Sequence, residues 1–362
     1  MKKHEEIDAN FKYEKAEHSD SLVYYDIPNP AFTLVGVNFS EENGFTRLPI
    51  ADAKRVSEDV EILAYHTSGG RLLFKTDSKK LEIRVSYPYL TKLRNLELAA
   101  SGFVLIERRG DERRYIKIMP PDWNADTGYS FTVDLEGGMR EYILYFPICT
   151  RVRTLSIGLD EGAAVMPLNI YTGLPILYYG SSITQGFCAG RPDNTYEAFI
   201  EKWSEVDFIN LGFSGSGRGE DAMIEYLSGI DCRIFVCDYN HSGVNLDYFA
   251  EQHPKLYREF RRTHPNTPIL FLTKTCVFTS YGNIESHERA AAQEKIIEKT
   301  YKDALASGDE NVYFLSGVAM FDEFSATDRM SLVNDSDHPN ELGFYVMAKK
   351  IYDKLSGIPM LL

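Results

Sequence analysis

The 362-residue chain lacks several features that define common classes of protein. No apolar run approaches the ~18–20 residues that a membrane-spanning helix needs, and no basic cluster interrupts the net charge of −14. Because so acidic a chain repels nucleic acid and anionic membranes, we expect neither as a partner. We expect the substrate to be uncharged or weakly charged. Two lysines near the N-terminus have no apolar stretch behind them, so no secretory signal is expected there.

Motifs for metals and nucleotides are also missing. The five cysteines form no Cys-x-x-Cys pair and no His-Glu-x-x-His occurs, so we expect no metal and no cofactor. The glycines of Gly215-x-Gly217-x-Gly219 do not have the spacing of a dinucleotide loop, and no Gly-Lys-Ser/Thr occurs. An odd number of scattered cysteines fits reduced thiols and therefore a cytoplasmic location.

The two halves of the chain carry different patterns, and 362 residues exceed the ~250–300 at which one core stops growing. Residues 1–172 contain short alternating apolar and polar runs, joined across turn signals such as Gly110-Asp111. They predict an N-terminal all-β sandwich, with no strong helix pattern between Leu22 and Leu168. Residues 173–362 alternate apolar strands with helical segments, which predicts a three-layer α/β/α domain with a parallel sheet. The helices are expected at Tyr196–Glu205, Glu220–Leu227, Leu246–Thr263, Glu288–Ala306 and after Pro339.

Small and polar residues follow the predicted parallel strands. Ser182 follows the strand "PILYY", Gly215 follows "DFINLGF" and Asn240 follows "RIFVCDY". An Asp-x-x-His pair, Asp335 and His338, follows the last strand. The carboxyl ends of parallel strands meet at one edge of a sheet, and a serine nucleophile needs a base, an orienting acid and oxyanion donors. We therefore expect Ser182, His338 and Asp335 to be catalytic. A glycine in the turn after "DFINLGF" and the asparagine after "RIFVCDY" can supply the oxyanion donors, through a backbone N–H and a side-chain amide.

Other interpretations compete with these assignments. Ser182 taken alone is an ordinary turn residue after a strand. His253 and His264 also precede proline, but neither has an acid three residues before it, so we expect them to face solvent or to cap a helix. Asp337 lies next to the histidine at position 338, where we expect an exposed acid at a helix start. Trp123 is a candidate substrate-binding residue, since an aromatic face suits the C–H face of a sugar, although most such residues only cover a core edge.

The four blocks together resemble the SGNH, or GDSL-type, hydrolases, which use Ser, Gly, Asn and His in this chain order. The resemblance covers Pro175 to the C-terminus. The usual Gly-Asp-Ser is here Gly180-Ser181-Ser182, and the usual Gly-x-Asn is Asp238-Tyr239-Asn240, so the local geometry is expected to differ there. The resemblance implies a flavodoxin-like fold and serine-dependent ester hydrolysis without a cofactor. It also implies an oxyanion hole formed by the backbone N–H groups of Ser182 and Gly215 and by the Asn240 amide.

The first half is similar to the jelly-roll-like β-sandwich domain that precedes one branch of this family, most clearly at "GFTRLP", Gly44 to Pro49. Members with this layout resemble carbohydrate O-acetyl esterases. The resemblance therefore implies hydrolysis of small acyl esters, with a small-molecule or oligosaccharide ester as substrate. A lysophospholipase, thioesterase or acyltransferase of the same fold, or a non-catalytic carbohydrate-binding protein, are the alternatives that the sequence leaves open.

Overall fold

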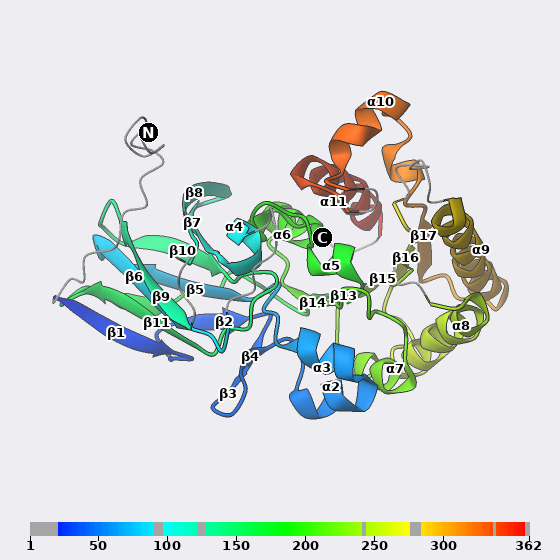
Figure 1. Cartoon of the computed structure of the whole chain (residues 1–362). Coiled ribbons are helices and arrows are strands. Elements are labelled where there is room, and N and C mark those ends of the chain that lie inside the picture. The colour runs from blue at the N-terminus through cyan, green and yellow to red at the C-terminus, as the bar shows by residue number, and fades with distance from the viewer. Residues whose placement is uncertain are drawn as a thin grey trace, which may run out of the picture.

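The computed structural model of the chain describes residues 21–89, 97–121, 127–240, 244–275, 284–335 and 338–358. A β-rich part formed by the first half of the chain lies beside an α/β part formed by the second half (Figure 1). This arrangement confirms the expected fold class, an all-β sandwich followed by an α/β/α unit.

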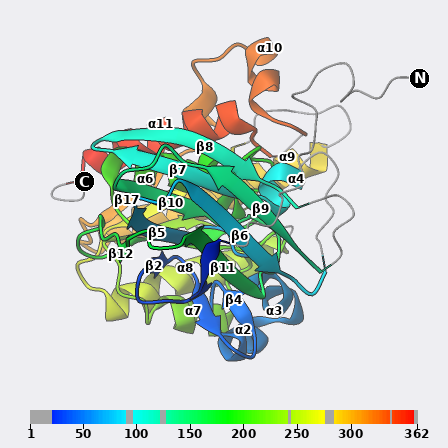
Figure 2. The ribbon, with the colours of Figure 1, turned by 90° about the vertical axis from the view of Figure 1, so that its left-hand side faces the viewer.

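Two large antiparallel sheets and a two-stranded one, β3-β4, form the β-rich part, which faces the viewer in Figure 2. One sheet has the order β1-β11-β6-β9, and the other has the order β12-β5-β10-β7-β8 with β2 added beside β5. Alternate residues of both sheets, such as Phe74, Ile83 and Ile157, meet in a shared apolar core. The strands are β1 (Leu22–Ile27), β2 (Thr33–Val35), β3 (Asn38–Ser40), β4 (Gly44–Thr46), β5 (Arg71–Thr76), β6 (Lys80–Ser86), β7 (Phe103–Arg109), β8 (Glu112–Met119), β9 (Gly128–Asp134), β10 (Arg140–Tyr145), β11 (Thr154–Asp160) and β12 (Val165–Pro167).

The α/β part is built on a five-stranded parallel sheet in the order β14-β13-β15-β16-β17, the flavodoxin-like order. Because successive side chains of a strand point to opposite faces, Tyr178 packs in the same core as α6 and α11, whereas Leu177 packs with α7, α8 and α9. The strands are β13 (Ile176–Gly180), β14 (Phe208–Gly212), β15 (Ile234–Asp238), β16 (Ile269–Leu272) and β17 (Val312–Leu315). The helices are α5 (Ser182–Gln185), α6 (Tyr196–Ser204), α7 (Asp221–Leu227), α8 (Leu246–Thr263), α9 (Ile284–Ala306), α10 (Ala326–Arg329) and α11 (Glu341–Ser356).

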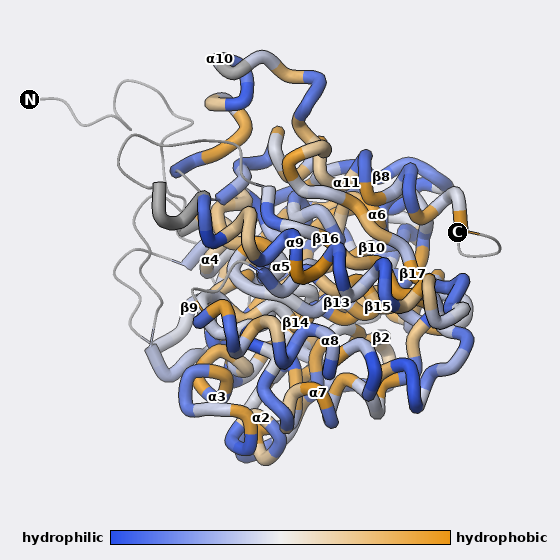
Figure 3. Tube along the Cα trace, turned by 90° about the vertical axis from the view of Figure 1, so that its right-hand side faces the viewer, coloured by the Kyte–Doolittle hydropathy of each residue, from blue (hydrophilic) through white to orange (hydrophobic). Residues whose placement is uncertain are grey.

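The helices around this sheet are amphipathic. Hydrophilic and hydrophobic segments alternate along α7 and α8 in Figure 3, as expected for helices with one face on a core and the other in solvent. Among the described residues, no helix combines the length and the apolar character needed to cross a membrane.

The first half, where the sequence shows no strong helix pattern, nevertheless contains helices. Three short helices occur there: α2 (Ile50–Val56), α3 (Glu58–Ala64) and α4 (Glu97–Ser101). Each spans two turns or fewer, so its helical period is weak, and none stands in the alternation of strands and helices that revealed the equally short α7. The buried side chains of α2 and α3 belong to the core that also contains α7, α8 and α9, so these two helices complete the α/β part and lie beside α7 (Figure 1). Ala99 and Ala100 of α4 belong to the core on the other face of the sheet, with α6 and α11.

Candidate active site

The register of the parallel sheet brings three loops to one edge. Gly180 at the end of β13 pairs with Gly212 of β14 on one side and with Asp238 of β15 on the other. Ser182 lies two residues after Gly180, and Asn240 lies two residues after its pairing partner Asp238. The glycine-rich turn after β14 leaves the sheet at this level too, so the three predicted blocks converge above the carboxyl ends of neighbouring strands.

A hydrogen-bonded chain links serine, histidine and aspartate. Ser182 Oγ lies 2.8 Å from His338 Nε2, and His338 Nδ1 lies 2.8 Å from Asp335 Oδ2. Asp335 Oδ1 also accepts a 2.7 Å hydrogen bond from the backbone N–H of His338. Because a carboxylate only accepts hydrogen bonds, Nδ1 carries the ring proton and Nε2 of the neutral ring is free to accept one from Ser182. The structure thus brings together the three residues expected to be catalytic.

The loop that carries His338 is fixed to the loop after α5. Asn334 Nδ2 donates a 3.0 Å hydrogen bond to the backbone carbonyl of Cys188, and Asn334 N–H donates to His338 O at 3.0 Å. The ring of Phe187 meets the His338 ring edge to face, with 4.9 Å between the centroids. These contacts hold the imidazole against the serine from one side and leave the carboxylate of Asp335 half exposed.

The amide of Asn240 is buried without a partner. Its side chain is 2% exposed, and neither Nδ2 nor Oδ1 has a hydrogen-bond partner within the part of the chain that the structure describes. A buried amide left unpaired costs about 1–3 kcal/mol, so such a group calls for an explanation. A ligand that accepts from Nδ2 would supply the missing hydrogen bond.

The glycine at position 215 shapes the neighbouring turn. Gly215 has φ +67°, a left-handed conformation that other residues rarely adopt, and no atom lies within 4 Å of the position of a Cβ there. The N–H groups of Ser216 and Gly217 donate to Phe213 O at 2.8 and 3.0 Å, and neither bond uses the Gly215 N–H. The turn therefore presents its tip to open space.

A glutamine that the sequence did not single out supports this turn. Gln185 Oε1 accepts a 3.0 Å hydrogen bond from the backbone N–H of Ser214, and Gln185 Nε2 lies 2.9 Å from His66 Nδ1. Burial, together with the charge of Arg47, lowers the pKa of His66 to about 3, so this imidazole is neutral and its Nδ1 accepts. The β-rich part therefore helps to set the position of the glycine-rich turn.

Arg47, in the "GFTRLP" stretch, makes a second link of this kind. Its guanidinium donates to His66 O and to Leu63 O, each at 2.8 Å, and to the carbonyl of Gly212 at the end of β14. It also lies over the ring of Phe213 at 4.7 Å from the centroid. Burial lowers the pKa of Arg47 to about 9, and the carbonyls stabilise the charge that remains.

The structure tests the expectations for two further histidines but not those for Trp123 and Asp337. The expectation that His253 faces solvent or caps a helix is wrong, because it is 1% exposed and its Nδ1 lies 3.0 Å from Thr300 Oγ1 of α9. His264 is the C-cap residue of α8, as expected, but its side chain is largely buried. Trp123 and Asp337 lie outside the described residues, and their expected roles stay predictions.

A cavity of about 550 Å³ opens beside the glycine-rich turn. Charged and hydrogen-bonding groups predominate in its lining, which consists of Gly215, Arg218, Glu220, Val244, Asn245 and Tyr248. Glu220 Oε2 is buried and has no hydrogen-bond partner among the described residues, and burial raises the pKa of this carboxyl group.

A flavodoxin-like sheet with Ser, Gly, Asn and His blocks at one edge defines the SGNH class of hydrolase fold. A model of the GDSL-like lipase/acylhydrolase family matches residues 174–356, and the chain belongs to this family. A second model, for the N-terminus of SGNH-hydrolase-type esterases, matches residues 22–165. The resemblances seen in both halves of the sequence are confirmed.

Solved structures show the same two-part fold. The chain is 26% identical to a protein from Bacteroides ovatus described as a GDSL-like lipase, with a TM-score of 0.83 over 92% of this chain and 97% of that one. It is 19% identical to the salicylyl-acyltransferase SsfX3 of a tetracycline biosynthetic pathway, with a TM-score of 0.75 over 95% and 100%. A family two carbohydrate esterase from Clostridium thermocellum, solved with cellohexaose, is 14% identical with a TM-score of 0.61 over 90% and 98%. No curated protein matches the chain.

Proposed function

We propose that this member of the family is a serine esterase that removes small acyl groups, above all O-acetyl groups, from carbohydrates. The observation that carries the proposal is the pair of 2.8 Å contacts from Ser182 Oγ to His338 Nε2 and from His338 Nδ1 to Asp335 Oδ2. Nucleophile, base and orienting acid thus stand in the order that acyl transfer needs.

In the first half of the reaction, Ser182 Oγ attacks the ester carbonyl while His338 Nε2 takes the hydroxyl proton. Asp335 stabilises the imidazolium that forms without taking up the proton itself. The carbonyl oxygen becomes an oxyanion, which accepts hydrogen bonds from the backbone N–H groups of Ser182 and Gly215 and from Asn240 Nδ2. His338 then gives its proton to the departing alcohol, and the acyl group stays on the serine.

The second half repeats these steps with water. His338 Nε2 takes a proton from a water molecule, which attacks the acyl-enzyme, and the same donors stabilise the second oxyanion. Collapse of this intermediate releases the acid and returns the proton to Ser182 Oγ. Asn240, whose amide has no partner among the described residues, gains one in these states.

The substrate class is inferred from the cavity beside Gly215 and from the relatives. Arg218, Glu220 and Tyr248 offer hydrogen-bonding groups suited to hydroxyl-rich ligands rather than to long acyl chains. The likeness of the fold to a carbohydrate esterase solved with cellohexaose supports the same substrate class. A cytoplasmic location remains part of the proposal and rests on the number and scatter of the cysteines.

The likeness to a salicylyl-acyltransferase favours a second candidate function. An acyltransferase would use Ser182, His338 and the oxyanion donors in the same first half-reaction. The difference lies in the second half, in which an acceptor hydroxyl group replaces water at the acyl-enzyme. Hydrolysis and transfer therefore differ in the acceptor that the site admits and not in the catalytic residues.

Acetate release from a panel of acetylated oligosaccharides tests the proposal. We expect release by the wild-type protein and none above background by Ser182→Ala prepared in parallel. Comparison of acetyl with octanoyl p-nitrophenyl esters separates small-acyl from lipase-like activity, and acetyl should be preferred. Added sugar or phenol acceptors that divert the acyl group from water would favour the acyltransferase. No serine-dependent turnover of any ester would refute both functions.

A further inference from the structure

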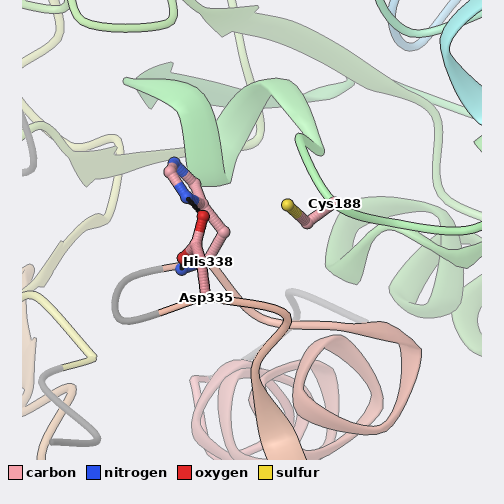
Figure 4. A group of neighbouring side chains, drawn as sticks. All are labelled: Cys188, Asp335 and His338. Carbon is pink, nitrogen blue, oxygen red and sulfur yellow. Dashed lines mark hydrogen bonds and ion pairs between the residues drawn. The ribbon is translucent and has the colours of Figure 1, made fainter. Parts of the chain in front are cut away.

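Cys188 has no part in the proposed reaction, yet its thiol lies beside the two residues that control the serine. Sγ of Cys188, a carboxylate oxygen of Asp335 and a ring nitrogen of His338 all lie within 4.8 Å of one another, and Figure 4 shows the three side chains. Among the described residues this is the one group of three such side chains that meets this limit. We propose that Cys188, Asp335 and His338 form a binding site for a thiophilic divalent cation, Zn²⁺, and that its occupation inhibits the enzyme.

The ligand set matches the preferences of Zn²⁺. Thiolate sulfur, imidazole nitrogen and carboxylate oxygen are its usual protein ligands, and a tetrahedral site has room for a water molecule as the fourth. Bond lengths of ~2.0–2.3 Å place tetrahedral ligands roughly 3.3–3.8 Å apart. Since the three ligand atoms lie within 4.8 Å of one another, shifts of at most roughly 1–1.5 Å bring them to these separations. Asp335 can supply part of this movement, because its side chain is 48% exposed.

The thiol changes its state when the cation binds. Burial, with the charge of Asp335 adding to it, raises the pKa of Cys188 to about 12, so the thiol keeps its proton in the free enzyme. A protonated thiol does not compete with Ser182 as a nucleophile. Coordination forms the Zn–S bond, breaks the S–H bond and releases that proton to solvent. The backbone of Cys188 is held near the histidine loop by the bond from Asn334 Nδ2, which keeps the sulfur in range.

Binding at either nitrogen of the ring removes the general base. If the cation takes Nε2, the lone pair that would accept the Ser182 proton is occupied. If it takes Nδ1, the proton of the neutral ring moves to Nε2, which then donates to Ser182 Oγ instead of accepting from it. Asp335 is also drawn from the ring to the cation. Inhibition therefore follows without any block of the substrate cavity.

A Zn²⁺ titration in metal-buffered solution tests the site. The rate of p-nitrophenyl acetate hydrolysis should fall as the free Zn²⁺ concentration rises. Each rate is divided by the rate of the same variant in the absence of metal. Cys188→Ser should raise the Zn²⁺ concentration for half-inhibition at least about tenfold, since even changes around metal ligands cost ~10–100-fold in affinity. Cys232→Ser is the matched control: it also removes a buried thiol, but one in the core on the side of the sheet away from α6 and α11, and its sensitivity to Zn²⁺ should equal that of wild type.

A binding measurement makes the test independent of turnover. Calorimetry on Ser182→Ala should detect one Zn²⁺ per chain, and Co²⁺ should give a thiolate-to-metal charge-transfer band that is lost in Ser182→Ala/Cys188→Ser. Absence of binding, or binding and inhibition that Cys188→Ser leaves unchanged, would overturn the site. Binding without any esterase activity would instead refute the proposed function and leave the metal site standing.

Discussion

The buried amide of Asn240 has no hydrogen-bond partner within the described part of the chain, and this predicts opposite effects on activity and on stability. Asn240→Ala should lower kcat by ~10²–10³, the cost of losing one oxyanion donor, with a smaller change in KM. The same variant should unfold no more easily than wild type, because it removes a buried amide whose lack of a partner costs about 1–3 kcal/mol. Steady-state kinetics and urea denaturation measure the two effects. A change confined to KM would make Asn240 a substrate-binding residue instead.

Asp335 is the member of the triad most exposed to solvent, and its contribution is separable from that of Ser182 and His338. Asp335→Asn removes the charge that stabilises the imidazolium and can hold the ring in the wrong tautomer, so kcat/KM should fall by as much as ~10⁴. Profiles of kcat/KM between pH 5 and 9 for wild type and variant measure this loss. Profiles that coincide in height and shape would leave Ser182 and His338 as a dyad.

Residues in short motifs at strand ends were predictable from sequence, and residues that act across the molecule were not. Ser182 and Asn240 each follow an apolar strand, and the rule that parallel strands share an edge brings them together. The Asp335–His338 pair comes a long loop after β17 and was found by its Asp-x-x-His spacing. Gln185 and Arg47 carry no such signal. Their contacts reach His66 and Gly212, which lie 119 and 165 residues away in the chain, so only the folded structure shows that they support the glycine-rich turn.

Helix α8 contains a buried histidine that makes stability depend on pH. Burial lowers the pKa of His253 to about 3, and the rings of Tyr239, Phe249 and Phe271 surround it. Thr300 Oγ1 donates to Ile296 O, so it accepts from His253 Nδ1–H, and the ring is neutral when folded. Between about pH 6.5 and 3 the unfolded chain binds a proton here that the folded chain does not.

The free energy of unfolding should therefore fall on acidification, by about 1.4 kcal/mol per pH unit for this residue. His253→Gln removes the titrating group and keeps a donor for Thr300. Between pH 7 and pH 5 the variant should lose roughly 2 kcal/mol less stability than wild type, as measured by urea denaturation. Equal losses in the two proteins would show that His253 becomes protonated in the folded state.

Length and neighbouring strands together decided which helices the sequence revealed, because α7, with only seven residues, was expected from its place between two apolar strand runs. The 18-residue helix α8 begins and ends where the apolar period predicted, because five turns display the pattern clearly. Helices α2 and α3, with seven residues each, were missed. Their apolar residues pack into a core built mainly by the second half of the chain, and the local sequence does not reveal this core.

The two parts of the molecule share hydrophobic cores as well as a connecting segment. Leu48, Ile50, Ala53, Val60 and Ala64 belong to the core beneath the parallel sheet, and the outer face of the β10-containing sheet packs against Ala198 of α6. The division of the chain after residue 172 stays a proposal. The packing implies that the second part needs a surface supplied by the first.

A truncated chain of residues 173–362 tests that implication. Without α2 and α3 it exposes apolar side chains of α7 and of the sheet, so we expect a dye-binding, aggregation-prone protein without a cooperative unfolding transition. The full chain, prepared in parallel, should unfold cooperatively and bind little dye. A truncated chain that unfolds cooperatively and hydrolyses p-nitrophenyl acetate at the full rate would show that the second part is independent.

The nucleophilic role of Ser182 is tested most directly by covalent labelling. An organophosphonate that reacts with activated serines should add once per chain, and fragmentation of the labelled peptide should place the adduct on Ser182. His338→Ala should slow labelling strongly, because no base then takes the serine proton. Ser182→Ala should take up no label. An unlabelled wild-type protein that is folded, or an adduct on a different residue, would contradict the account.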